Sequence, residues 1–157
     1  MSSIPFRRGL IAVVLTLAAG LACAAETTEI TVVDPYARAV PSVVPNSAAF
    51  MVLTNAGAAE RKLVGARSDA AATVELHTHI NDDGVMRMRQ VEDIAIPAGG
   101  ETVLQPGGLH LMLIGLHQPL QPGDSLTLEL EFDDGSTRSL TVPVRKIEMG
   151  QMGHHHH

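Results

Sequence analysis

Short runs in which apolar and polar residues alternate make up most of this chain, and turn-forming residues separate them. Alternation with a period of two is typical of β-strands that bury one face. After the first 24 residues, no segment shows a helical period. The pattern therefore predicts an all-β domain with strands over residues 30–33, 48–54, 72–79, 85–90, 92–96, 102–105, 110–114, 125–132 and 139–144.

The clearest pair of strands is the last one. In residues 125–132 every second position is apolar, and a turn of sequence Asp133-Asp134-Gly135-Ser136 leads into residues 139–144, which alternate in the same way. Such a hairpin has one apolar face for a core. Many short strands of this kind, joined by tight turns, are typical of a two-sheet sandwich.

Residues 1–24 have the parts of an export signal: the positive pair Arg7 and Arg8, an uncharged apolar run, and a small-x-small cleavage pattern that ends at Ala24. The apolar run is too short for a convincing membrane-spanning helix. We expect a cleaved signal peptide and a mature periplasmic protein without stable membrane insertion. Two other readings stay open: a twin-arginine signal, and lipidation of Cys23, although the residues before this cysteine match a lipobox poorly.

Cleavage would change the composition of the mature chain. Loss of two arginines takes the formal net charge from −6 to −8, and the single cysteine is also removed. An acidic chain offers no basic patch for nucleic acid or for anionic lipid. Without a thiol, an exported protein can hold a soft metal through Met and His alone. We expect one domain over residues 25–146 and a flexible Met/His-rich tail over 147–157.

Four candidate metal ligands stand at set intervals in the middle of the chain: His77, Met88, His110 and Met112. Thioether sulfur and imidazole nitrogen suit Cu(I), whereas magnesium and calcium prefer oxygen ligands. Alternation turns His110 and Met112 together away from Leu111, about 7 Å apart at their Cα atoms, and toward the outside. A single methionine is more often core filler, and a single strand histidine is more often merely exposed. The joint pattern favours a metal site.

The spacing H-x10-M-x21-H-x-M resembles the periplasmic PCuAC copper chaperones. The segment Tyr36-Ala37-Arg38-Ala39 is similar to that family's aromatic-Ala-Arg segment, and residues 46–55 and 120–144 are similar to its second strand and closing hairpin. The resemblance implies a cupredoxin-like Greek-key β-sandwich that binds Cu(I) and delivers it to the copper centre of cytochrome c oxidase subunit II, or to another copper-handling assembly protein. Carried over by position, the ligands are His77, Met88, His110 and Met112.

Other metal donors remain without an assigned role. His79 and Met86 are either adjacent side chains or transient ligands during transfer. The tail holds Met149, Met152 and four final histidines, which are either a purification tag or a native arm that binds Cu(II) through imidazoles. We also expect the mature protein to be a monomer.

Rival classes of protein differ in the chemistry they need. A blue-copper electron carrier requires a cysteine thiolate, which the mature chain would lack. No Ser/His/Asp arrangement and no recognisable acidic pair indicates an enzyme. Two alternatives to a chaperone stay open: a periplasmic copper buffer that sequesters the ion, and a β-sandwich adhesion or assembly module that binds no metal.

Overall fold

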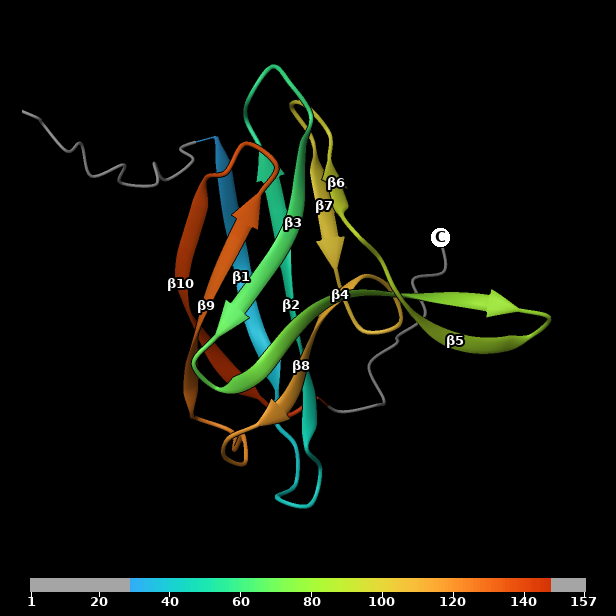
Figure 1. Cartoon of the computed structure of the whole chain (residues 1–157), viewed down its shortest axis with the longest axis vertical. Helices are drawn as coiled ribbons and strands as arrows, with labels where there is room; N and C mark the ends of the chain where they lie inside the picture. Colours follow the sequence, from blue (N-terminus) through green and yellow to red (C-terminus); the bar gives the residue numbers. More distant parts are fainter. Residues whose placement is uncertain (1–28, 148–157) are drawn as a thin grey trace, which may run out of the picture.

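The computed structural model describes residues 29–147, and these form an all-β sandwich, as the alternation predicted (Figure 1). No helix in this part of the chain is long and apolar enough to cross a membrane. The predicted signal peptide and residues 148–157 of the predicted tail lie outside the described residues. The strands are β1 (Ile30–Arg38), β2 (Asn46–Asn55), β3 (Arg61–Ser68), β4 (Ala71–Asp82), β5 (Val85–Gln90), β6 (Ile94–Ile96), β7 (Glu101–Leu104), β8 (His110–Leu116), β9 (Ser125–Phe132) and β10 (Thr137–Arg145).

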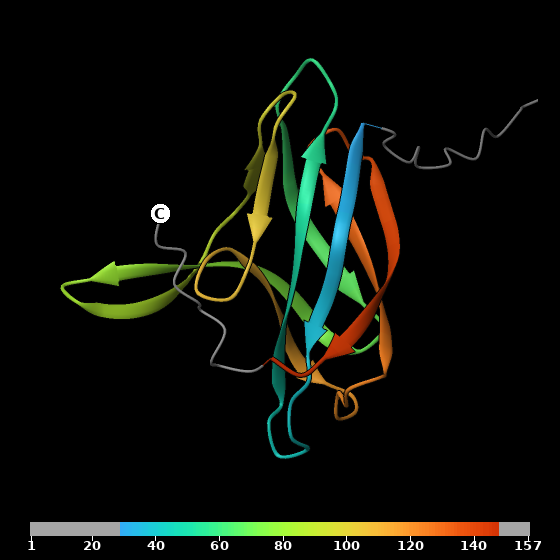
Figure 2. The same ribbon diagram turned by 180° about the vertical axis from the view of Figure 1, so that it is seen from behind.

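The strands form two layers that meet along β1 and β10. One layer has the order β5-β4-β8-β2-β1, with β7 also paired to β2, and the other has the order β10-β9-β3-β6. The two layers are joined by a short parallel pairing of β1 with β10, and both layers are visible from behind in Figure 2. Apolar side chains fill the space between them, and Leu128 and Leu130 of β9 are fully buried there. The predicted hairpin of β9 and β10 is confirmed, since the two strands pair antiparallel.

A bulge in β1 makes this strand longer than the sequence predicted. Val33 pairs with Val52 and Tyr36 pairs with Phe50, so β1 has one residue more than β2 between these pairs. Asp34, within the bulge, has a φ of 46°. An extra residue exchanges the two faces of a strand. As a result, the strand continues past residue 33 and Tyr36 lies beside Phe50, on the face away from the core.

The strand β3 was not predicted. In its sequence Arg-Lys-Leu-Val-Gly-Ala-Arg-Ser, Leu63 is the one fully buried residue, and charged residues and Gly65 interrupt the alternation. The pairing of β3 with β9 also shifts register between Leu63 and Gly65. Cross-strand pairing with β9 and β6, rather than local pattern, therefore makes this segment a strand.

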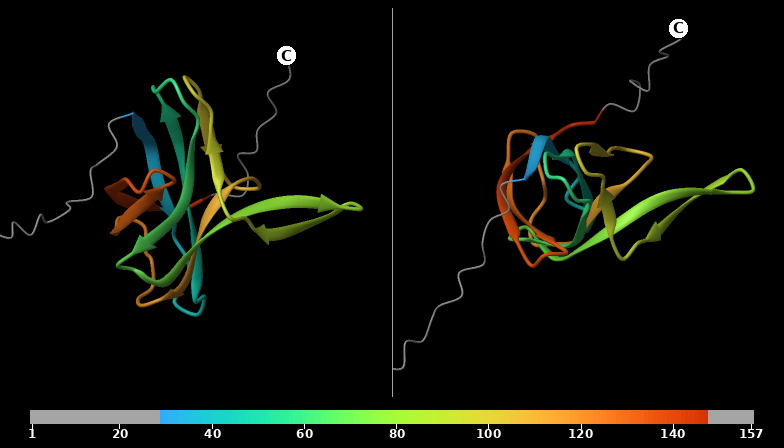
Figure 3. Two further views of the ribbon diagram at one scale, coloured as in Figure 1. Left: turned by 45° about the horizontal axis from the view of Figure 1, so that its top comes forward. Right: turned by 90° about the horizontal axis from the view of Figure 1, so that it is seen from above.

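The hairpin of β4 and β5 projects from the sandwich, as Figures 1 and 3 show. Its turn residues Asp83 and Gly84 both have positive φ, 51° and 84°. An Asp-Gly pair in this conformation is favoured in two-residue hairpin turns. Every residue of β5 is exposed, because this strand is at the edge of its sheet and pairs with β4 alone.

Candidate metal centre

Three neighbouring strands bring the candidate ligands to one face of their sheet. In the pairing of β4 with β8, His77 lies opposite His110, and in the pairing of β4 with β5, His79 lies opposite Met88. Residues directly opposite each other in antiparallel strands share a face. Met112, two residues after His110 in β8, is on this face as well.

His110 is buried, with 2% of its surface exposed. Its ring packs against the rings of Phe50, His77 and His79, with centroids 6.3, 5.8 and 5.2 Å away. The sequence-based expectation that His110 faces solvent was therefore wrong. Its direction away from the core was correct, since Leu111 is fully buried on the other face. Aromatic and imidazole rings from β2 and β4 cover this second face.

The two ring nitrogens of His110 have different surroundings. Nδ1 is 3.0 Å from the carbonyl oxygen of Gly108, which can accept but not donate a hydrogen bond, so Nδ1 carries the proton. Nε2 lies 3.3 Å from the sulfur of Met88. Burial lowers the pKa of His110. A neutral His110 therefore directs the lone pair of Nε2 at a thioether sulfur, and this places two soft donors side by side.

His77 has a similar arrangement with a different partner. Its Nε2 is 2.8 Å from a carboxylate oxygen of Glu75, and its side chain is 15% exposed. The carboxylate oxygen accepts this hydrogen bond from Nε2–H, so Nδ1 is the nitrogen that can offer a lone pair to a metal. Nδ1 is buried and has no hydrogen-bond partner among residues 29–147. Histidines that bind metals commonly donate their other N–H to a carboxylate or a backbone carbonyl. The surroundings of His77 and His110 both fit this pattern.

An open cavity of about 1420 Å³ lies along the same face. The candidate donors among its lining residues are His79, Met86, Met88, His110 and Met112. His77 does not line the cavity but lies next to His110. The structure therefore brings the four predicted residues to one face, with three of them at the cavity and His77 beside its wall.

Arginine and aromatic side chains also line the cavity. The guanidinium of Arg145 lies 5.1 Å from the ring centroid of Tyr36 and makes an ion pair of 2.9 Å with Asp34. Arg38 lies 5.9 Å from the ring centroid of Phe50. Sequence reasoning assigned no role at the site to these groups or to Glu75. For Glu75 a signal existed, since it stands two residues before His77 on the same strand face.

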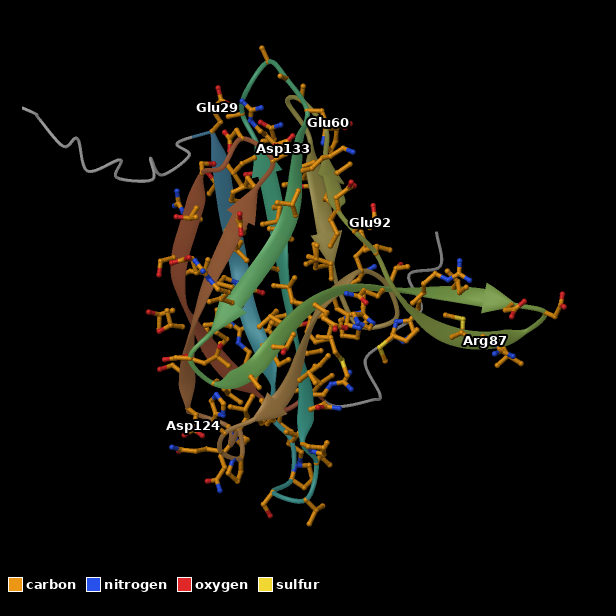
Figure 4. All side chains as sticks on the ribbon, in the orientation of Figure 1. Glu29, Glu60, Arg87, Glu92, Asp124 and Asp133 are labelled. Atoms are coloured by element: carbon orange, nitrogen blue, oxygen red, sulfur yellow. The ribbon has the colours of Figure 1, made fainter. Side chains whose placement is uncertain are left out.

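Carboxylates do not form the centre. Within residues 29–147 no group of three or more His, Cys, Asp or Glu side chains is placed to hold a metal ion. Figure 4 shows Glu29, Glu60 and Asp133 at one end of the sandwich, away from the β4–β5 hairpin. A metal held at the cavity would therefore need the thioethers, and this donor set favours a soft ion over calcium, magnesium or zinc.

Comparison with known protein families identifies the family to which the chain belongs. The model of the LpqE-like family, described as "Putative lipoprotein LpqE-like", matches residues 30–144, and the chain belongs to this family. A protein of Leifsonia xyli subsp. xyli, named as a lipoprotein, is 40% identical over 100 residues, 63% of this chain and 60% of the relative. An uncharacterized protein of Rickettsia prowazekii is 34% identical over 116 residues, 71% of this chain and 64% of the relative. The matches thus span less than two thirds of these relatives.

The structure of the chain is similar to solved structures that include PCuAC domains, the domain whose motif the sequence resembles. Apo-DR1885 from Deinococcus radiodurans is 32% identical, with a TM-score of 0.62, over 96% of this chain and 100% of DR1885. The Cu(I) form of DR1885 is 36% identical, with a TM-score of 0.61, over 76% and 82% of the two chains. The copper-bound PCuAC domain from PmoF2 has a TM-score of 0.65 at 18% identity, over 76% and 94%, which shows a shared fold. The prediction of a cupredoxin-like β-sandwich is confirmed.

Proposed function

We propose that this protein is a periplasmic copper chaperone that binds one Cu(I) and delivers it to the copper centre of cytochrome c oxidase. The proposed ligands are His77, Met88, His110 and Met112. The observation that carries the proposal is the 3.3 Å approach of the Met88 sulfur to Nε2 of a buried, neutral His110. The similarity to DR1885, whose structure is known with Cu(I), supports the same ion.

Release of copper is as important to a chaperone as binding. Met88 is 49% exposed on the projecting hairpin, whereas His110 is buried. An acceptor can approach the ion from the Met88 side and replace the thioethers one at a time, without unfolding of the sandwich. This open side favours a chaperone over a copper buffer, for which complete enclosure of the ion would be an advantage.

Export of the protein is part of the proposal. The signal pattern of residues 1–24 and the lipoprotein description of the family both agree with an exported protein. The family description also supports the alternative that Cys23 is lipidated, which would tether the same domain to a membrane surface.

A second proposed site, for Cu(II), consists of the histidines at positions 154–157. Ile147, the last residue that the structure describes, lines the cavity.

Transfer of one copper tests the chaperone proposal. Purified protein without residues 1–24 is loaded with Cu(I) and mixed with the copper-free soluble domain of oxidase subunit II, and the absorption spectrum of the acceptor is followed. We expect the acceptor spectrum to develop with equal loss of copper from the donor. Copper that stays with the donor would indicate a buffer. Failure to compete with a Cu(I) chelator, or equal affinity for zinc, would favour a module that does not handle copper.

A further inference from the structure

The cavity has more soft donors nearby than the proposed copper site uses. Three imidazoles and three thioethers lie along this one face, and four of these six groups are assigned as ligands. His79 and Met86 remain. Both line the cavity, and both belong to the hairpin that projects from the sandwich.

The positions of these two residues lead outward from the buried histidine. The ring of His79 is 5.2 Å from the ring of His110, and His79 lies directly opposite Met88. Met86 is two residues from Met88 on the same face of β5, one step closer to the hairpin turn, and is 56% exposed. The donors therefore form a series from the buried side of the sheet to solvent. His110 is the innermost, Met88 and His79 come next, and Met86 is the outermost.

The hydrogen bond that His79 makes to the backbone of the described residues is a weak one. Its Nδ1 is 3.4 Å from the carbonyl oxygen of Gly108, and the same oxygen accepts a shorter hydrogen bond, of 3.0 Å, from His110. A bond of 3.4 Å is weak. The ring can thus turn toward an ion without loss of a strong hydrogen bond.

We propose that His79 and Met86 form an outer station that holds Cu(I) in transit between the solvent and the inner four-ligand site. Copper stays in the +1 state throughout. In each step one thioether or imidazole replaces another in the coordination of the ion, so no electron or proton donor is required. This inference rests on the proposed copper-binding function but assigns new residues to it.

A residue on the path and a residue in the final site have different kinetic effects. Loss of a station raises the barrier for entry and for exit equally, because the same path is used in both directions. The association and dissociation rates then fall by the same factor, and Kd stays constant. Loss of a ligand weakens binding, mainly through faster dissociation.

The test compares H79Q/M86L with the wild-type protein, and H117Q/V85A serves as control. The control also replaces one histidine and one exposed hairpin residue, but neither residue lines the cavity. Stopped-flow measurements give the rate of Cu(I) uptake from a chelator complex and the rate of removal by excess chelator, and equilibrium competition gives Kd. We expect both rates of H79Q/M86L to fall about tenfold, with Kd changed less than about twofold, and the control to behave as wild type.

Each other outcome identifies a different error. Weaker Kd with faster removal would overturn the station and make His79 or Met86 a ligand of the main site. Unchanged rates and unchanged Kd would overturn any role for the pair. Absence of Cu(I) binding by the wild-type protein would reject the proposed function itself. If the double variant does not fold, M86L alone, at a position that is 56% exposed, provides the same comparison.

Discussion

His110 and Leu111 are neighbours in β8 whose side chains lie on opposite faces of the sheet, and both are buried. Leu111 contributes to the core between the layers, while His110 packs against Phe50 and two other histidines. His110, on the face of β8 away from the core, therefore contributes to folding as well as to the proposed copper site.

Replacement of His110 or Leu111 by alanine should destabilise the copper-free protein, and the two losses should differ in size. Leu111→Ala should cost roughly 2–5 kcal/mol, because it leaves a cavity in the core. His110→Ala should cost about 1–2 kcal/mol, because it removes a partly buried hydrogen bond to Gly108. Chemical denaturation of the copper-free variants measures both free energies. An unchanged free energy of unfolding for His110→Ala would contradict the packing described for this ring.

Replacement of Met88 by leucine should separate copper binding from stability. Met88→Leu keeps the volume but removes the sulfur, so Cu(I) affinity should fall by about tenfold or more, with a loss of stability below about 1.5 kcal/mol. Met51→Leu is the matched control, because Met51 is fully buried in the core. Chelator competition measures both affinities. Equal affinities for the two variants would exclude Met88 as a ligand.

The stability of the copper-free protein should fall as the solution becomes acidic. Burial lowers the pKa of His110 in the folded state below the usual value of 6.5. Between the folded and the usual pKa the unfolded chain binds more protons, so this contribution is complete above about pH 6.5 and is lost as the pH falls toward the folded pKa. Urea denaturation between pH 8 and 5 should show this loss in the wild type and much less of it in His110→Gln.

Copper affinity should depend on pH for a related reason. A protonated imidazole cannot coordinate a metal, whereas thioethers do not titrate in this range. Cu(I) affinity should therefore decrease from pH 8 to pH 5, and the contribution of His110 to this decrease should appear at lower pH than for an ordinary histidine. An affinity that stays flat over this range would indicate that neither His77 nor His110 is a ligand.

The strand alternation was sufficient to predict the side of the sheet for His110 and Met112 but not the exposure of His110. Alternation in β8 correctly directed Leu111 to the core and His110 away from it. Burial of His110 depends on Phe50, which is distant in sequence and reaches the same face through the pairing of β2 with β8. A strand pattern contains no information about what covers its polar face. The family resemblance predicted that the four donors form one site, and the β4–β5 and β4–β8 registers, which bring them to one face, depend on pairing between strands.

Other features could not be predicted because they depend on contacts between distant strands. The extra residue of β1 reverses the faces of Tyr36 and Ala37 relative to a regular strand, and no local pattern indicates it. The segment of β3 has too few apolar residues to identify a strand by itself. In both cases the neighbouring strand determines the conformation.

Glu75 provides a test of how His77 is oriented. Its carboxylate accepts a hydrogen bond of 2.8 Å from Nε2 of His77. Glu75→Gln should weaken Cu(I) binding by roughly 10- to 100-fold, because an amide oxygen is a weaker acceptor than a carboxylate and holds the ring less firmly with Nδ1 free for the ion. Glu92→Gln, at an exposed site outside the cavity, should have no effect. If both variants bind Cu(I) like the wild type, the hydrogen bond has no role in the site.

Deletion of residues 149–157 should remove a Cu(II) site and leave the Cu(I) site intact. The four histidines of this segment suit Cu(II), whereas the thioether-rich sandwich suits Cu(I). The deletion begins after β10, and every core residue found among the described residues 29–147 comes before it. Its effect on stability should therefore be within about 0.5 kcal/mol. Paramagnetic resonance of both proteins, loaded with Cu(II), measures the imidazole-type signal and its stoichiometry. An unchanged spectrum after deletion would leave the histidines without a copper role and favour a purification tag.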